Sequence, residues 1–168
     1  MTAELIALPL GQGFVTPARS AAPTRLSVAS DRETSFEVTA PDARILLEDA
    51  AAALVRRIAP REAGAPACWW ETVQLDGRDI TDLAGRLLDR IIDVGTEQHK
   101  AVASVFVDAI GEPDPEDDRS RWRLRARIGI RPFGLEGPPA RTVRSTSDRP
   151  LTIETTGRSL TLRARIAF

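Results

Sequence analysis

The chain has 168 residues, of which 42% are hydrophobic and 28% are charged, and its formal net charge is −1. This composition is ordinary for a globular domain, and a chain of this length buries about 70% of its unfolded surface, so disulfides are not needed. The single cysteine, Cys68, excludes an internal disulfide and a thiolate zinc cluster. It is compatible with a reducing compartment, and we expect a cytoplasmic location.

Residues 1–29 are rich in small residues and proline, and we expect an N-terminal extension there, either an edge hairpin or a flexible arm. The apolar run at residues 5–10 is short, contains Pro9 and follows no basic region. It therefore predicts neither a signal peptide nor a membrane span. Residues 30–168 are expected to form a single domain.

A strand is predicted at residues 34–39, where Phe36 and Val38 alternate with polar residues and face the core. Asp42 follows as the expected N-cap of a first helix, which Pro60 ends. Four apolar residues at helical spacing predict the buried stripe of this helix. They are Leu47, Ala51, Leu54 and Ile58.

Another strand and a second helix are predicted next along the chain. The strand is expected at residues 69–75, and the helix begins near Ile80 or Thr81. Gly95 is expected just beyond the end of this helix, as its left-handed capping residue. The apolar stripe of the second helix consists of Ile80, Ala84, Leu87, Ile91 and Val94.

Strands predominate in the second half of the chain. They are expected at residues 102–108, 121–131, near 142–145, at 151–155, and from 160 to 168. Strands that accumulate after two helices indicate the α+β class. The simplest arrangement is two helices packed on one face of a largely antiparallel or mixed sheet.

The pentapeptide Leu-Arg-Ala-Arg-Ile occurs twice, at residues 124–128 and 162–166. Both copies lie in runs that alternate apolar and polar residues, so each run buries one face and exposes the other. If the two strands are close in one sheet, their arginines form a positive stripe suited to the phosphates of RNA. The arginines of this predicted contact are Arg121, Arg123, Arg125, Arg127, Arg163 and Arg165.

The sequence leaves two alternatives to such a stripe. Neighbouring acids, such as those of the acidic loop at residues 112–118, would neutralise the arginines, or the two strands would lie in separate regions of the sheet. Trp122 is the only aromatic residue among the arginines, and it alternates to the opposite face. The acidic run at residues 112–118 is interpreted as a solvated hairpin loop, because it lacks the glycine and the closing glutamate of an EF-hand.

Catalytic motifs are sparse. Cys68 and His99 are a conceivable nucleophile and base, but a small inert thiol and a surface histidine explain them better. Gly11 and Gly13 lack both the lysine and the third glycine of phosphate-binding loops. We therefore expect a protein that is not an enzyme.

From about residue 30 onward, the chain resembles archease, the small accessory protein of the tRNA-splicing RNA ligase. The strand, turn and helix start at residues 36–42 carry part of this resemblance, together with the apolar positions that follow. Asp82-Leu83 begins a helix at the spacing of the family's D-L-x-x-L-L helix. Residues 143–154 match the family's V-K-A-x-T-Y-H-x-L-x-I-E segment in length and apolar positions, and a glycine turn and a last strand follow. The resemblance implies an archease-like α+β fold.

The resemblance also implies a function. In the family, archease promotes guanylylation and multiple turnover of the ligase. We therefore expect an accessory protein of an RNA ligase in tRNA splicing or RNA repair, or a degenerate relative of one. The alternatives are an RNA- or polyanion-binding module and a structural protein that associates with itself through exposed strand edges.

The metal-binding cluster that the resemblance implies is altered in this chain. The aspartate and histidine of the family's H-T-A-D motif fall on Glu33 and Ser30, and the tyrosine and histidine of its T-Y-H motif fall on Asp148 and Arg149. The aspartate beside the C-terminus falls on Ala167. A calcium-like cation needs several oxygen ligands, so we expect Glu33 to remain as a single altered ligand and the site to be lost.

Overall fold

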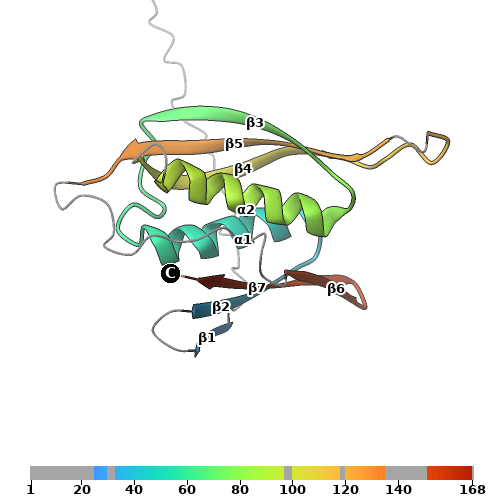
Figure 1. Cartoon of the computed structure of the whole chain (residues 1–168), viewed down its shortest axis with the longest axis horizontal. Helices are drawn as coiled ribbons and strands as arrows, with labels where there is room; N and C mark the ends of the chain where they lie inside the picture. Colours follow the sequence, from blue (N-terminus) through green and yellow to red (C-terminus); the bar gives the residue numbers. More distant parts are fainter. Residues whose placement is uncertain (1–24, 30–32, 97–99, 118–119, 135–150, 168) are drawn as a thin grey trace, which may run out of the picture.

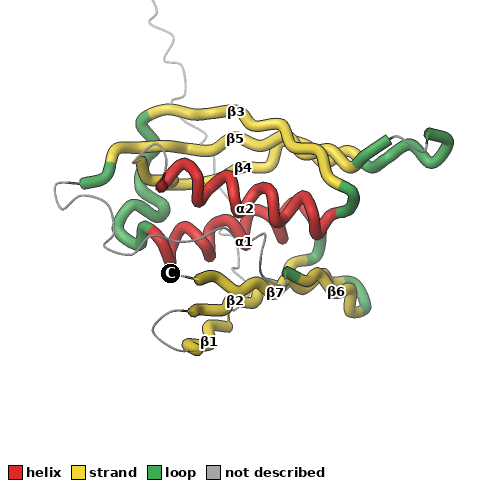
Figure 2. The backbone as a smooth tube through the Cα atoms, viewed as in Figure 1, coloured by secondary structure: helices red, strands yellow, loops and turns green. Residues whose placement is uncertain are grey.

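The computed structural model describes residues 25–29, 33–96, 100–117, 120–134 and 151–167. These residues form three layers, in which a pair of helices lies between a three-stranded sheet and a four-stranded sheet (Figures 1 and 2). The α+β class is confirmed. The strands are divided between two sheets, whereas the simplest sequence-based arrangement had one.

The three-stranded sheet has the order β3-β5-β4, and both pairings are antiparallel. The long β4 and β5 form a hairpin whose tip extends beyond the helices (Figure 1). The predicted strands at residues 69–75, 102–108 and 121–131 are all present, with slightly different ends. Their bounds are β3 Trp69–Gly77, β4 Lys100–Gly111 and β5 Trp122–Pro132.

The four-stranded sheet has the order β1-β2-β7-β6 and is also antiparallel throughout. Gly157 has a φ of 61° in the turn between β6 and β7, a conformation that glycine adopts without steric cost. The strand predicted near residues 142–145 and residues 1–24 of the extension lie outside the described residues. The bounds are β1 Arg25–Ala29, β2 Glu33–Ala40, β6 Thr152–Thr156 and β7 Ser159–Ala167.

Helix α1 (Ala43–Ile58) lies between the sheets and contacts β2 and β7 on one side and β4 on the other. The predicted N-cap is confirmed, because the Asp42 carboxylate accepts a hydrogen bond from the Ile45 N–H at 2.8 Å. The predicted stripe is buried, but it is only part of the buried surface. A helix between two sheets needs apolar residues on two sides, and the additional ones are Leu46, Ala50, Ala53 and Val55.

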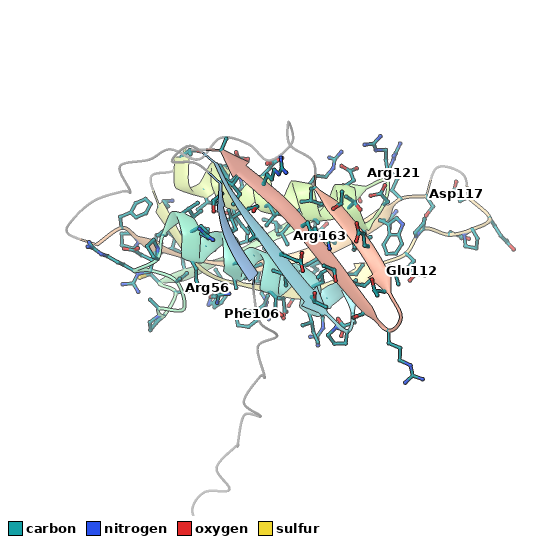
Figure 3. The ribbon with its side chains drawn as sticks, turned by 90° about the horizontal axis from the view of Figure 1, so that it is seen from below. Arg56, Phe106, Glu112, Asp117, Arg121 and Arg163 are labelled. Carbon is teal, nitrogen blue, oxygen red and sulfur yellow. The ribbon has the colours of Figure 1, made fainter. Side chains whose placement is uncertain are left out.

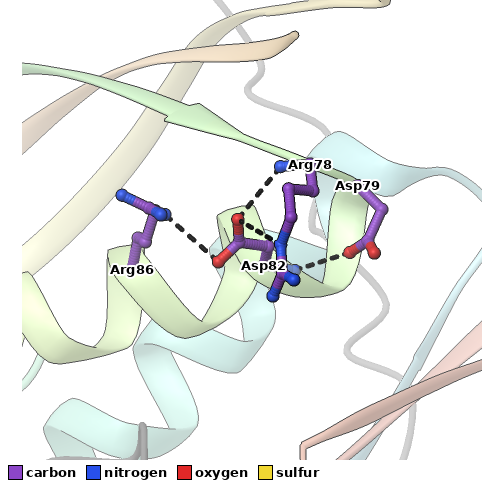
Figure 4. A network of polar contacts seen from close by, with 4 residues as sticks. All are labelled: Arg78, Asp79, Asp82 and Arg86. Atoms are coloured by element: carbon purple, nitrogen blue, oxygen red, sulfur yellow. Dashed lines mark hydrogen bonds and ion pairs between the residues drawn. The ribbon is translucent and has the colours of Figure 1, made fainter.

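Helix α2 (Ile80–Thr96) contacts all three strands of the three-stranded sheet. Its start is fixed by two hydrogen bonds that involve the Asp79 and Asp82 carboxylates (Figure 4). The Asp79 carboxylate accepts from the Asp82 N–H at 2.8 Å, and the Asp82 carboxylate accepts from the Arg78 N–H at 3.0 Å. The first bond satisfies an N–H group that the first helical turn leaves free, and the second ties the residue before the cap to that turn.

The expected capping role of Gly95 is wrong. The helix continues through Thr96, and Gly95 does not have a positive φ. The Thr96 hydroxyl donates to the Ile92 carbonyl at 3.0 Å, which is the hydrogen bond to the carbonyl four residues back that threonine commonly forms in helices.

Candidate functional site

The two copies of the arginine pentapeptide lie in different sheets. Arg123, Arg125 and Arg127 are on β5 of the three-stranded sheet, whereas Arg163 and Arg165 are on β7 of the four-stranded sheet. Because the helices separate the sheets, the outward faces of the two strands are on opposite sides of the molecule. The shared stripe that would require these strands to be neighbours is therefore not formed.

On the outer face of the four-stranded sheet, Arg163 is held between two carboxylates. Its guanidinium donates to Glu37 on β2 at 2.8 Å and to Glu154 on β6 at 2.9 Å. The hydrogen bond to Glu37, followed by the charge of Glu154, raises the pKa of Arg163. Figure 3, which looks onto this sheet, shows Arg163 on the near face. The two carboxylates outweigh the charge of Arg163, so this part of the face offers little net attraction to a polyanion.

On the outer face of the three-stranded sheet, the arginines are paired less completely. The Arg127 Nε donates to both oxygens of Asp108, at 2.9 and 3.2 Å. Arg125 reaches the same carboxylate only at 3.9 Å, and Arg123 reaches Asp76 at the same distance. Three arginines therefore share two carboxylates, and these acids come from neighbouring strands and not from the acidic loop.

Two exposed aromatic side chains, Trp70 on β3 and Phe106 on β4, extend this arginine row. They are 46% and 43% exposed, and their ring centroids are 5.5 Å apart at an interplanar angle of 41°. The guanidinium carbon of Arg127 lies 5.9 Å from the Trp70 centroid and 6.0 Å from the Phe106 centroid, within the range of cation–π attraction. In the sequence only Trp122 lies among the arginines, so neither ring was predicted to be near them.

Gly129 on β5 provides the surface beneath these rings. It is the register partner of both Trp70 and Ser104. A Cβ at this position would lie 2.9 Å from Cζ3 of Trp70 and 2.7 Å from the Ser104 Oγ. The absence of a side chain therefore allows Trp70 to lie over the strand. We call the set Trp70, Phe106, Gly129, Arg125 and Arg127 the aromatic–arginine face.

The acidic loop lies at the tip of the β4–β5 hairpin, away from the aromatic rings. Figure 3 shows Arg121 at this end of the molecule together with Glu112 and Asp117. The Asp114 carboxylate accepts from the Glu116 N–H at 2.9 Å, as expected for a carboxylate that stabilises a turn. The loop residues that are described are mostly exposed, which agrees with a solvated loop.

The positions aligned with the archease metal cluster are only partly described. Glu33 at the start of β2 is the backbone register partner of Ala167 on β7. Ser30, Asp148 and Arg149 lie outside the described residues. Ala167 is buried and has no oxygen to offer in its side chain, and the described residues contain no group of three or more potential metal ligands. Ala167 therefore cannot act as a side-chain ligand of a hard cation.

Cys68 is a free, exposed cysteine beside β3, and His99 lies outside the described residues, so the pairing of these two residues is not defined. Among the described helices, none combines the length and the apolar character needed to cross a membrane.

No protein-family model matches the chain, and no curated protein sequence matches it. Its fold is similar to the solution structure of protein 1598 from Methanobacterium thermoautotrophicum, with a TM-score of 0.67. The likeness covers 86% of this chain and 98% of that protein at 13% sequence identity. At this identity the match shows a shared fold, with its layers and connections, and does not extend to activity.

Proposed function

We propose that this chain is an archease-like accessory protein that acts on an RNA ligase and is not itself catalytic. One observation carries the proposal most directly. The fold extends over nearly the whole of the archaeal protein that it resembles, and it is of the α+β class that the archease resemblance predicts. A shared fold does not by itself assign an activity, so the assignment depends on the sequence resemblance as well.

Of the segments that carry the sequence resemblance, those that the structure describes lie in defined structural elements, and residues 143–150 lie outside the described part of the chain. Residues 36–42 run from the middle of β2 to the N-cap of α1. Asp82-Leu83 lies in the first turn of α2, where Asp82 makes the hydrogen bond to Arg78 and Leu83 is fully buried. The glycine turn is the β6–β7 connection. The described motifs therefore lie where this fold requires a helix cap, a buried apolar residue or a turn, which supports the resemblance.

The altered cluster refines the proposal. The backbone pairing of Glu33 with Ala167 joins two of the positions that the resemblance assigns to the archease metal site, and one of them now has a methyl group. We infer that any accessory activity does not depend on the full set of acids. Either Glu33 acts with residues outside the family pattern, or the ligase is recognised through another surface.

A ligation assay with the Glu33→Ala variant tests these alternatives. The RNA ligase of the same organism is assayed under multiple-turnover conditions with the wild-type chain, with Glu33→Ala and without any addition. Loss of stimulation in Glu33→Ala, with an unchanged unfolding midpoint, assigns a role to this carboxylate. Full stimulation by the variant would indicate that another surface acts on the ligase. Absence of stimulation by both proteins would contradict the proposed function.

A further inference from the structure

The outer face of the three-stranded sheet combines aromatic rings with cations, and the geometry points to single-stranded RNA as its ligand. The inference does not depend on the proposed function, because the face is defined by its own side chains. We propose that unpaired bases stack on Trp70 and Phe106 while the backbone phosphates follow the arginine row of β5.

The aromatic rings have the chemistry required for base stacking. Each of them remains almost half exposed although it belongs to an ordered sheet. They lie on neighbours of β5 on either side, so together they cover the sheet above Gly129 and Arg127. Stacking on aromatic side chains tolerates any base sequence, because every base has a π face. Arg127 adds a cation beside both rings, which strengthens such contacts.

The arginines have the chemistry required for phosphate. Alternate residues of a strand are about 7 Å apart along one face, so Arg123, Arg125 and Arg127 form a regular row of guanidinium groups. The side chains of Arg123 and Arg125 are 78% and 62% exposed, and each meets its carboxylate only at 3.9 Å. Exposed ion pairs of this kind contribute little, and a phosphate would displace them and receive two parallel hydrogen bonds.

Uncharged polar side chains complete the face. Thr72 and Gln74 on β3 are the register partners of Arg127 and Arg125, and both are exposed. Together with Ser104 opposite Gly129, they offer donors and acceptors to base edges. By contrast, the outer face of the four-stranded sheet holds its central arginine between two glutamates. Equivalent arginines of the two pentapeptides should therefore differ in their effect on RNA binding, and they provide a matched pair of variants.

The test is fluorescence anisotropy of a labelled single-stranded oligouridine of about twelve nucleotides. This length is within the range bound by one OB-fold. The full chain is titrated at several salt concentrations. Arg125 and Arg163 occupy the same position of the two pentapeptides, so Arg125→Gln and Arg163→Gln change the net charge equally. Trp70→Ala and Phe106→Ala test stacking, and thermal unfolding of each variant checks its fold.

We expect binding that weakens steeply with salt, and a loss of affinity of about ten-fold in Trp70→Ala and in Phe106→Ala. Arg125→Gln should weaken binding and reduce the slope of log affinity against log salt by about 0.7, the value for one phosphate contact on a single strand. Arg163→Gln should bind as the wild type does. A matched duplex RNA should bind more weakly than the single strand, because its bases are not free to stack.

Three results would overturn the inference. One is the absence of binding by the folded wild-type chain. Another is an equal loss in Arg125→Gln and Arg163→Gln, which would indicate non-specific attraction by net charge. The third is unchanged RNA binding in Trp70→Ala. If this variant bound RNA normally but failed to stimulate the ligase, the aromatic–arginine face would be assigned to contact with the ligase protein. A chain that binds RNA without stimulating the ligase would support this inference and contradict the proposed function.

Discussion

The buried carboxylate of Glu48 on α1 accepts a hydrogen bond from the backbone N–H of Val107 on β4 at 2.9 Å. Val107 lies at a register shift, where Asp108 is the additional residue between Val107 and Ala109. A bulge of this kind disrupts the regular ladder locally, and Glu48 is the acceptor for the Val107 N–H beside it. The same bulge places Asp108 where it pairs with Arg127, so a residue of the core supports the geometry of the outer face.

Removing the Glu48 carboxylate should destabilise the fold. Glu48→Ala leaves the Val107 N–H without this acceptor in a buried position, and we expect a loss of about 1–3 kcal/mol in the free energy of unfolding. Glu48→Gln keeps an acceptor oxygen and should cost less. Urea unfolding measures both, with the exposed Glu116→Ala as control. Equal stabilities of Glu48→Ala and the control would show that the hydrogen bond does not contribute.

The start of α2 should make stability depend on pH. The hydrogen bond from the Arg78 N–H, assisted by Arg86, lowers the pKa of Asp82. A folded-state pKa below the unfolded value stabilises the protein at pH values above the unfolded pKa, and this stabilisation is lost as the pH falls through the folded pKa. Asp82→Asn should therefore lower the free energy of unfolding by about 0.3–1 kcal/mol near neutral pH, as expected for the loss of a negative charge in a first helical turn, and by progressively less in acid.

Urea unfolding of Asp82→Asn and of the wild type at a series of pH values checks this expectation. Asp42→Asn is the control at the other helix, because asparagine caps helices as well as aspartate does. It should cost little at neutral pH. A cost of Asp82→Asn that stays constant from neutral to acidic pH would contradict the account.

Gly129→Ala should disturb the aromatic–arginine face from below. The added Cβ would approach Trp70, Ser104 and Ala67 at 2.7–2.9 Å, so some of these atoms must move. We expect a destabilisation of about 1–3 kcal/mol, typical of overpacking, and a change in tryptophan fluorescence. Gly85→Ala is the control, because nothing lies within 4 Å of a Cβ there. An unchanged fluorescence spectrum in Gly129→Ala would contradict the packing of Trp70 over this glycine.

The alternation of residues predicted most strands and which side of each is buried, because those depend on local periodicity. It did not predict which strands are neighbours. Residues 124–128 and 162–166 have the same sequence yet lie in different sheets, since pairing is decided by contacts far apart along the chain. Part of the buried surface of α1 was missed for a related reason. A single apolar stripe at helical spacing predicts a helix that packs on one side, whereas α1 packs against both sheets.

The aromatic–arginine face could have been found in part from the sequence. In β3 the exposed positions include Trp70, Thr72 and Gln74, so an aromatic residue occupies the polar phase of the strand. Phe106 similarly lies between the buried Val105 and Val107. An aromatic residue out of phase indicates an exposed ring. That the two rings meet over Gly129 depends on the pairing of β3 and β4 with β5, which periodicity does not provide.

The most direct measurement of the central claim is the number of ligation products formed per molecule of RNA ligase. A limiting amount of the ligase from the same organism is incubated with excess RNA substrate, with and without the purified chain. We expect the ligase alone to stall early and the chain to restore repeated turnover. Unchanged product yield, with a folded chain and an active ligase, would contradict the assignment as a ligase accessory protein.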